Sequence, residues 1–151
     1  AEKAAADLRA EGLKAEAAND LGGEIAKADI VSCCTITDTP LVKGALLKPG
    51  AHLDLVGGFT PAMREADDDA VRRATVFVDT RGGATKEAGD IVQPLASGVL
   101  KPEDIAGDLY DLARGNASGR ETAEEITLFK SVGAAIEDLA AGIAVYEKMR
   151  G

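Results

Sequence analysis

Three short apolar segments most constrain the fold of this 151-residue chain. They are 29–36 (DIVSCCTI), 51–58 (AHLDLVGG) and 75–80 (TVFVDT), and they are apolar and rich in β-branched residues. Such runs are typical of strands that are covered on both faces. Helical patterns separate them, and the succession strand, helix, strand, helix, strand is characteristic of a parallel sheet. The sequence therefore predicts an α/β fold built on a parallel sheet.

The remaining segments predict mostly helices. Gly12 is a natural end for the first helix, Asp20 can cap the second, and Pro40 and Pro102 stand at first helical positions. The expected elements are helices over 1–12, 20–28, 61–74, 84–98 and 101–115, a short helix or turn over 37–50, a weak strand over 13–19, a turn around 81–83 and a loop over 116–125.

The C-terminal segment allows two interpretations. The spacing of Thr122 and Glu125 matches a capping box, which favours one helix from 122 to 149. Such a helix would be ~42 Å long at 1.5 Å per residue, whereas a compact chain of this size has a radius of gyration near ~15 Å. We therefore prefer a strand over 126–130 followed by a helix from about 133 to 149.

Composition excludes several functions. Net charge is −9, and the 17 basic residues are scattered among 26 acidic ones with only 3% aromatic residues, so we expect no nucleic-acid binding. No apolar stretch approaches the ~18 residues that span a bilayer, so we expect no membrane insertion. The two cysteines, Cys33 and Cys34, are adjacent, which favours a reduced, cytoplasmic setting.

In parallel sheets ligands bind beyond the carboxyl ends of the strands. Three segments occupy such positions: 33–40, 56–61 and 78–83. The hydroxyls and amides of the first suit a ribose or phosphate, although Thr and Asp are also ordinary helix caps. Gly57-Gly58 either lets a flat ring lie against the backbone or permits positive φ in a turn. From composition alone, the cap and the turn are favoured.

Other polar features carry weaker signals. The amides of Ser131 to Gly133 would lie at a helix N-terminus, where they either receive a polar ligand group or only link two elements. His52 has no partner at motif spacing and is interpreted as structural. The sequence contains no GxGxxG or GxxxxGK[ST] motif and no recognised metal-ligand spacing, and Asp67 to Asp69 read as a solvated helix start.

An ordered series of segments gives the chain a family resemblance. The stretch ADIVSCCTITDTPLVKGALLKPGAHLDLVGGFTPAMREAD, then VFVDT, EAGDIVQPL and GRETAEEITLFKSVGAAIEDLAAG, resembles the ornithine cyclodeaminase/mu-crystallin family over nearly the whole chain. The resemblance implies a Rossmann-type domain that binds NAD(P)(H), joined to a second domain that supplies dimer contacts and most of the substrate pocket. It also implies hydride transfer at a carbon bearing an amine or imine.

Specific residues follow from the same resemblance. Cys34 and Thr35 match the family's cofactor-contacting strand end, Val56 and Gly57 match the wall beside the nicotinamide, and Ser131, Val132 and Gly133 match the KSxG turn that returns to nicotinamide and substrate. Ser131 is thus the expected substrate contact. The resemblance assigns no catalytic proton donor to this chain.

Two departures refine the resemblance. Cyclodeaminases and related alanine dehydrogenases carry Asp directly after the glycine pair, where this chain has Phe59, so GGFTPAMRE looks more like the ketimine-reductase branch. The family's first strand, glycine-rich pyrophosphate turn, second strand and substrate domain would all precede residue 1. We therefore expect a C-terminal fragment or truncated homologue that does not turn over alone.

The resulting expectation is a partial Rossmann-type domain over 1–115 and a strand-helix segment over 116–151 that returns toward the substrate and dimerisation domain. The expected activity is reduction of a cyclic ketimine such as Δ1-pyrroline-2-carboxylate, with a small amino or imino acid as substrate and a homodimer or higher homo-oligomer as the assembly. The alternatives are ornithine cyclodeaminase itself and a non-catalytic binding or assembly module, for which an unpaired sheet edge would serve.

Overall fold

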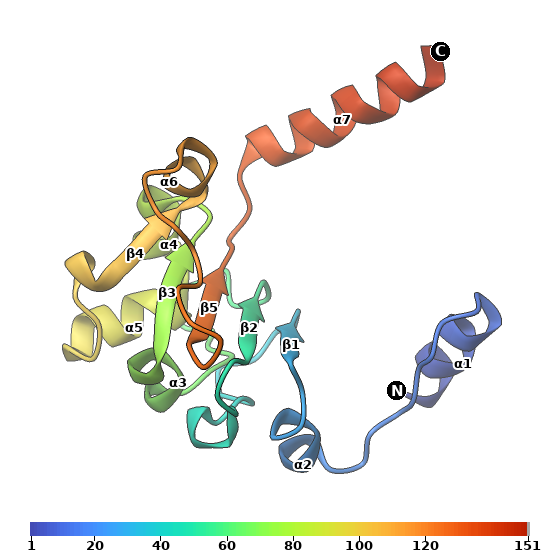
Figure 1. Cartoon of the computed structure of the whole chain (residues 1–151), viewed down its shortest axis with the longest axis horizontal. Coiled ribbons are helices and arrows are strands. Elements are labelled where there is room, and N and C mark those ends of the chain that lie inside the picture. Colours follow the sequence, from blue (N-terminus) through green and yellow to red (C-terminus); the bar gives the residue numbers. More distant parts are fainter. Residues whose placement is uncertain (151) are drawn as a thin grey trace.

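A five-stranded parallel sheet forms the centre of the molecule in the computed structural model, which describes residues 1–150 (Figure 1). The strand order is β1-β2-β5-β3-β4. The strands are β1 (Ile30–Cys33), β2 (His52–Leu55), β3 (Ala74–Val78), β4 (Ile105–Asp108) and β5 (Ile126–Lys130). Every pairing is parallel, which confirms the predicted α/β class.

Seven α-helices and two 3₁₀ turns are described within residues 1–150. They are α1 (Glu2–Ala10), α2 (Leu21–Ile25), η1 (Gly44–Leu46), α3 (Asp68–Arg73), α4 (Arg81–Glu87), α5 (Gly89–Ser97), η2 (Pro102–Asp104), α6 (Leu109–Arg114) and α7 (Ala135–Arg150). The expected helices near both ends are confirmed, Asp20 caps α2 through the Gly23 amide, and the strand-then-helix interpretation of the C-terminal segment is correct.

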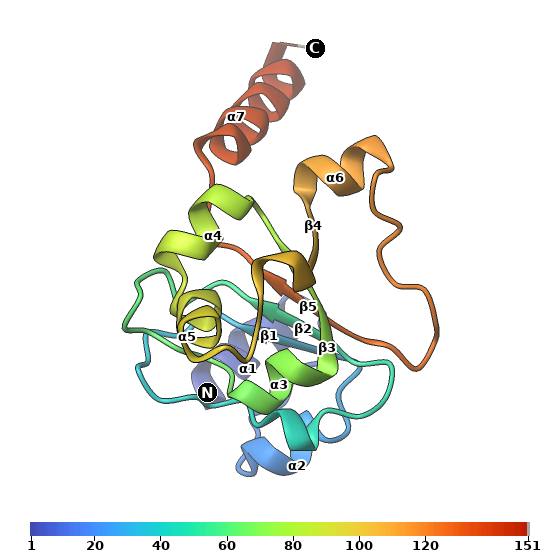
Figure 2. The ribbon, with the colours of Figure 1, turned by 90° about the vertical axis from the view of Figure 1, so that its left-hand side faces the viewer.

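One face of the sheet carries the hydrophobic core. Helices α3, α4 and α5 lie together on this face (Figure 2), and Leu53 and Leu55 of β2 point into it and are fully buried. Their neighbours His52 and Asp54 point to the other face and are only half-buried. The expectation that the strands are covered on both faces is therefore wrong for β2, because the helices that follow β2 and β3 pack on the same side.

Residues 60–66 do not join the helix that the sequence predicts over 61–74. Their backbone instead bonds to the segment after β1: the amides of Leu41 and Val42 both donate to the Glu65 carbonyl at 2.9 Å, and the Arg64 amide donates to the Thr37 carbonyl at 2.8 Å. Helix α3 begins only at residue 68, where the Asp67 side chain caps it through the Ala70 amide. The region 37–50 correspondingly holds only η1.

The expected helix over 84–98 is two helices. Thr80 caps α4 through the Gly83 amide, so residues 81–83 form the first turn of a helix rather than the expected turn. At the break after residue 88, the backbone bonds to the segment after β2, and the close approach requires a glycine. The Gly89 amide donates to the Thr60 carbonyl at 3.1 Å, and a Cβ on Gly89 would overlap the Met63 carbonyl oxygen.

The expected helix over 101–115 is also wrong. Residues 105–108 pair with β3 as an edge strand, in which Ile105 is buried and Gly107 lies opposite Phe77. The Asp108 side chain then accepts from the Asp111 amide at 3.0 Å and caps α6. Residues 13–19 form no strand.

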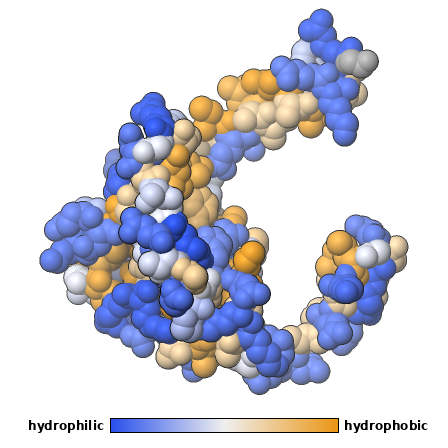
Figure 3. Space-filling view, in the orientation of Figure 1, coloured by the Kyte–Doolittle hydropathy of each residue, from blue (hydrophilic) through white to orange (hydrophobic). Residues whose placement is uncertain are grey.

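Helix α7 extends away from the sheet, and none of its described residues is buried (Figure 1). The space-filling view shows a hollow between α7 and α1, with apolar side chains along part of α7 (Figure 3). Among residues 1–150, no helix has both the length and the apolar character needed to cross a bilayer.

Candidate active site

The carboxyl ends of three neighbouring strands meet at one edge of the sheet. The pairing continues past the strands, because the Val56 amide donates to the Cys33 carbonyl at 2.8 Å and the Ser131 amide donates to the Leu55 carbonyl at 3.0 Å. All seven residues expected to contact the cofactor therefore come together, and we call them the strand-end surface. They are Cys34, Thr35, Val56, Gly57, Ser131, Val132 and Gly133.

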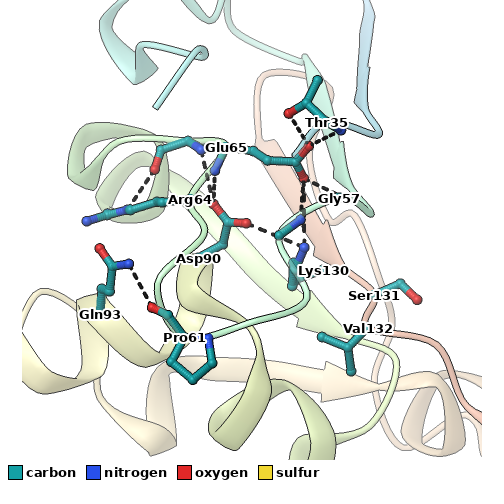
Figure 4. Close-up of polar contacts among 12 residues, drawn as sticks. Thr35, Gly57, Pro61, Arg64, Glu65, Asp90, Gln93, Lys130, Ser131 and Val132 are labelled. Atoms are coloured by element: carbon teal, nitrogen blue, oxygen red, sulfur yellow. Dashed lines mark hydrogen bonds and ion pairs between the residues drawn. The ribbon is translucent and has the colours of Figure 1, made fainter. Parts of the chain in front are cut away.

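A single buried carboxylate holds the first two strand ends together. Glu65 Oε1 accepts from both the amide and the hydroxyl of Thr35 at 2.7 Å, and Oε2 accepts from the amides of Gly57 at 2.8 Å and Gly58 at 3.2 Å (Figure 4). The Glu65 side chain has no exposed surface. The Thr35 donors are therefore directed inward and are not available to a ribose or phosphate.

The glycine pair is required by close packing. Neither Gly57 nor Gly58 has positive φ, so the turn interpretation is wrong in that respect. A Cβ on Gly57 would overlap the Thr35 backbone and Glu65 Oε1, and a Cβ on Gly58 would lie 2.5 Å from Asp90 Oδ2. The missing side chains make room for the buried carboxylates.

Two further buried charges lie beneath this glycine pair. Asp90 Oδ1 accepts from the amides of Glu65 at 2.8 Å and Ala66 at 3.0 Å, and Oδ2 faces Lys130 Nζ at 3.4 Å. Lys130 Nζ is also 3.8 Å from Glu65 Oε2. Burial raises the pKa of Asp90, an effect that Lys130 and the two amides oppose. The three side chains form a closed ionic cluster that solvent does not reach.

The end of β5 is fixed by another buried carboxylate. Asp79 Oδ2 accepts from the amides of Val132 at 2.8 Å and Gly133 at 2.9 Å and from the Ser131 hydroxyl at 3.2 Å. The Ser131 amide is already used in the sheet. Of the two interpretations of these amides, receipt of a ligand group is therefore contradicted, because Asp79 occupies that place.

The outer side of the strand-end surface presents neutral groups. Cys34 and Gly133 are exposed, Ser131 and Val132 are half-buried, and Val56 retains 42% of its accessible surface. The adjacent Phe59 is 48% exposed. The carboxylates of Glu65 and Asp79 and the ammonium of Lys130 all lie underneath. This surface suits the face of a flat, uncharged ring.

His52 lies at the opposite end of the sheet. Its Nδ1 is 2.8 Å from the Thr127 hydroxyl, and burial lowers its pKa below the usual value. Both residues border a separate cavity of about 740 Å³ on the open sheet face, which Phe77, Phe129 and Arg120 also line. The structural interpretation of His52 fits this position. Within the described 150 residues, no three His, Cys, Asp or Glu side chains are grouped to hold a metal ion.

Sequence reasoning missed the residues that organise the site: Glu65, Asp79, Asp90 and Lys130. One signal was present, because Lys130 ends an otherwise apolar strand, and a charge in such a strand needs a partner. The partners themselves are distant in sequence, at 65 and 90, and no local pattern links them.

Known proteins with similar sequences belong to one family. Residues 1–151 match the sequence model of the Ornithine cyclodeaminase/mu-crystallin family. The chain is 41% identical over 143 residues to Delta(1)-pyrroline-2-carboxylate reductase of Paracoccus denitrificans, covering 93% of this chain and 45% of that protein. It is 38% identical over 120 residues to mouse ketimine reductase mu-crystallin, covering 80% and 36%.

A solved structure agrees with the sequence relatives. The Thermococcus litoralis Delta(1)-pyrroline-2-carboxylate reductase, in complex with NADH and L-proline, superposes with a TM-score of 0.92 at 36% identity, over 98% of this chain and 46% of that one. The chain thus spans about half the length of the relatives it matches. On this evidence, the chain belongs to the ornithine cyclodeaminase/mu-crystallin family.

Proposed function

We propose that this chain is the nicotinamide-facing part of an NAD(P)H-dependent reductase of a cyclic ketimine such as Δ1-pyrroline-2-carboxylate. The observation that carries the proposal is the convergence of the strand ends of β1, β2 and β5, within a fold that superposes on a reductase holding NADH and L-proline. Because the chain covers about half of that reductase, the activity is proposed for these residues together with the rest of such a protein.

The strand-end surface fits a nicotinamide ring. Its backbone donors at Thr35, Gly57, Val132 and Gly133 all point inward to carboxylates, so the ring would meet carbon atoms and not unsatisfied amides. The exposed Val56 side chain would pack on the ring face. The ring carries little charge, which matches a surface without exposed charged side chains.

The chemistry is a two-electron reduction. Bound NAD(P)H supplies the hydride for the imine carbon, while a proton goes to the imine nitrogen and the C=N double bond becomes a single bond. Val56 and Gly57 would hold the ring in place and exclude water from one of its faces. Ser131, whose hydroxyl donates to Asp79, would orient the substrate as a hydrogen-bond acceptor. The residue that supplies the proton stays unassigned.

Phe59 separates reduction from cyclodeamination in this proposal. It follows the glycine pair directly, its amide donates to the Gly57 carbonyl at 2.9 Å, and its ring is exposed at the rim of the site. An apolar ring there cannot transfer a proton, so it favours the ketimine-reductase branch.

The assembly and the cellular setting belong to the same proposal. Helix α7, with no buried residue, would pack on the substrate and dimerisation domain of a homodimer. The free thiols of Cys33 and Cys34 fit a reducing, cytoplasmic setting.

The binding step can be tested on the chain itself. NADH and NADPH are titrated into the ¹⁵N-labelled chain, and we expect shift changes concentrated at the strand-end surface. Val56→Asp, which places a charge where the ring would pack, should remove them. Leu21→Asp is the matched control, because Leu21 is also exposed but lies in α2 at the other end of β1. Shift changes confined to other regions would contradict the proposal.

The catalytic step needs a hybrid in which residues 1–151 replace the matching part of the T. litoralis reductase. We expect Δ1-pyrroline-2-carboxylate-dependent NAD(P)H oxidation, followed at 340 nm, from the hybrid but not from the isolated chain. Turnover by the isolated chain would contradict the fragment hypothesis. A folded hybrid that releases ammonia from ornithine would instead support the cyclodeaminase alternative.

A further inference from the structure

Glu65 occupies an unusual position among the buried charges. It belongs to the segment after β2, yet its carboxylate bonds to the ends of two different strands, through the donors of Thr35 and the amides of Gly57 and Gly58. Four donors converge on two oxygens, and each oxygen serves one strand end. A single carboxylate therefore links the two strand ends just beyond the last backbone bond between them, in which the Val56 amide donates to the Cys33 carbonyl.

The backbone of Glu65 is held as firmly as its side chain. Asp90, in the first turn of α5, accepts from the amides of Glu65 and Ala66. Lys130 Nζ lies within 4 Å of both carboxylates and compensates part of their charge. The glycine pair is thus clamped from β1, β5 and α5 at once.

We propose that Glu65 is a positioning residue that sets the shape of the nicotinamide-facing wall. It touches neither cofactor nor substrate, because it is completely buried behind Gly57. Instead, it fixes Thr35 and the glycine pair in register, so that Val56 and Gly57 present a rigid outer surface. The inference rests on the proposed function only for the identity of the ring that the wall receives.

Substitution by glutamine separates this role from simple packing. Glu65→Gln keeps the shape of the side chain but replaces one acceptor oxygen by an NH₂ group, which is a donor. That group must face either the Thr35 donors or the Gly57-Gly58 amides, so one strand end loses its partner whichever way the amide turns. Glu125→Gln is a matched control: Glu125 also accepts bonds from Thr75, Glu121 and Thr122, but at the amino end of β5.

Amide hydrogen exchange, measured by NMR on the full chain, gives the first readout and needs no nucleotide. For Glu65→Gln we expect exchange at Thr35, Gly57 or Gly58 to accelerate by about tenfold to a hundredfold, the loss typical of a hydrogen bond to a charged acceptor. Amides of β3 should change much less. Glu125→Gln should leave the three amides unchanged. Uniform acceleration in Glu65→Gln, or none, would overturn the proposal.

The second readout is NADH affinity from the shift titration. Glu65→Gln should weaken NADH affinity by about tenfold, because a distorted wall loses most of its preorganised contact with the ring. Glu125→Gln should leave NADH affinity unchanged. Selective exchange with unchanged NADH affinity would overturn the positioning role. Selective exchange in Glu65→Gln, combined with a folded hybrid reductase that binds no NADH, would support Glu65 as the clamp and reject the proposed function. Asp90→Asn, which retains the Oδ1 acceptor, serves if Glu65→Gln does not fold, and should accelerate the same amides to a smaller extent.

Discussion

Lys130 Nζ lies 3.4 Å from Asp90 Oδ2, and among the described residues neither atom forms a hydrogen bond, although both are inaccessible to solvent. The pair is thus purely ionic in a place where water cannot solvate either partner. The two oxygens of Asp90 thus differ: Oδ2 faces only the ammonium group, whereas Oδ1 accepts hydrogen bonds from two amides. The stability of the candidate site therefore depends on charge balance among Glu65, Asp90 and Lys130.

Removal of the cation tests this dependence. Lys130→Met keeps much of the side-chain volume but leaves two buried carboxylates without a counter-charge, and we expect it to lower the free energy of unfolding by about 3–5 kcal/mol. The double variant Lys130→Met/Asp90→Asn should recover part of this loss, because one uncompensated charge is gone. Urea unfolding followed by circular dichroism measures both. A loss below about 1 kcal/mol for the single variant would contradict a dominant role of the ion pair.

The packing of the glycine pair gives a second prediction. Gly57→Ala should destabilise the chain by about 3 kcal/mol or more, because the new methyl group overlaps the backbone of Thr35. Gly82→Ala is the matched control in α4, where nothing lies within 4 Å of the added carbon. It should stabilise by about 0.5–1 kcal/mol. Equal effects of the two substitutions on the thermal midpoint would show that close packing does not require Gly57.

The adjacent cysteines should differ in reactivity. Burial, with a further contribution from Glu65 and Asp90, raises the pKa of Cys33 to about 12, whereas Cys34 is exposed. Because the thiolate is the reactive form, Ellman's reagent should modify one thiol per native chain and two after denaturation. Cys34→Ser should abolish the native reaction. Rapid modification of two thiols in the native state would contradict the buried position of Cys33.

His52 should make stability sensitive to mild acid. Its pKa in the folded chain is lowered, chiefly by burial, so the folded state binds a proton less readily than the unfolded state. The contribution of His52 to stability is fully present above the unfolded pKa near 6.5 and is lost as pH falls toward the folded pKa. His52→Gln should reduce the difference in unfolding free energy between pH 7 and pH 5. An unchanged difference would assign the acid sensitivity to other groups.

Phe59 should decide which reaction the site supports. In the hybrid reductase, Phe59→Asp places a carboxylate where the resemblance puts the proton-transfer residue of cyclodeaminases. We expect ornithine-dependent ammonia release to rise by about a hundredfold over the parent hybrid, within the range typical of an acid-base group. Phe59→Leu is the control, since it stays apolar and should release no ammonia. Ammonia release by the parent at the level of Phe59→Asp would contradict the assignment to the reductase branch.

The sequence predicted the parallel sheet because the segments that form β1, β2 and β3 carry strong local signals. It failed for β4, since Ile105–Asp108 contains glycine and follows Pro102 and two acidic residues that are typical of a helix start. Only its pairing with β3 makes it a strand. The alternation of His52 and Asp54 with Leu53 and Leu55 did indicate a one-sided strand, but the overall apolar character of the segment concealed it.

The strand ends converge as the sequence predicted, but the partners of their polar groups were not foreseen. Position relative to the strand ends was enough to bring Thr35, Gly57 and Ser131 together. The sequence left open whether the polar groups of Thr35 and Ser131 face a ligand; they face Glu65 and Asp79. Which carboxylate reaches which amide depends on contacts across 7 to 54 residues of sequence, and such contacts leave no periodic pattern.

The position of β5 has a consequence for synthesis on the ribosome. The last strand to be made lies in the middle of the sheet, and without it no backbone pairing joins β1-β2 to β3-β4. Lys130 arrives with this strand, so until then the carboxylates of Glu65 and Asp90 have no cation between them. Completion of the sheet must therefore wait until β5 has left the exit tunnel, and until then the edges of β2 and β3 that β5 covers stay unpaired and open to other chains.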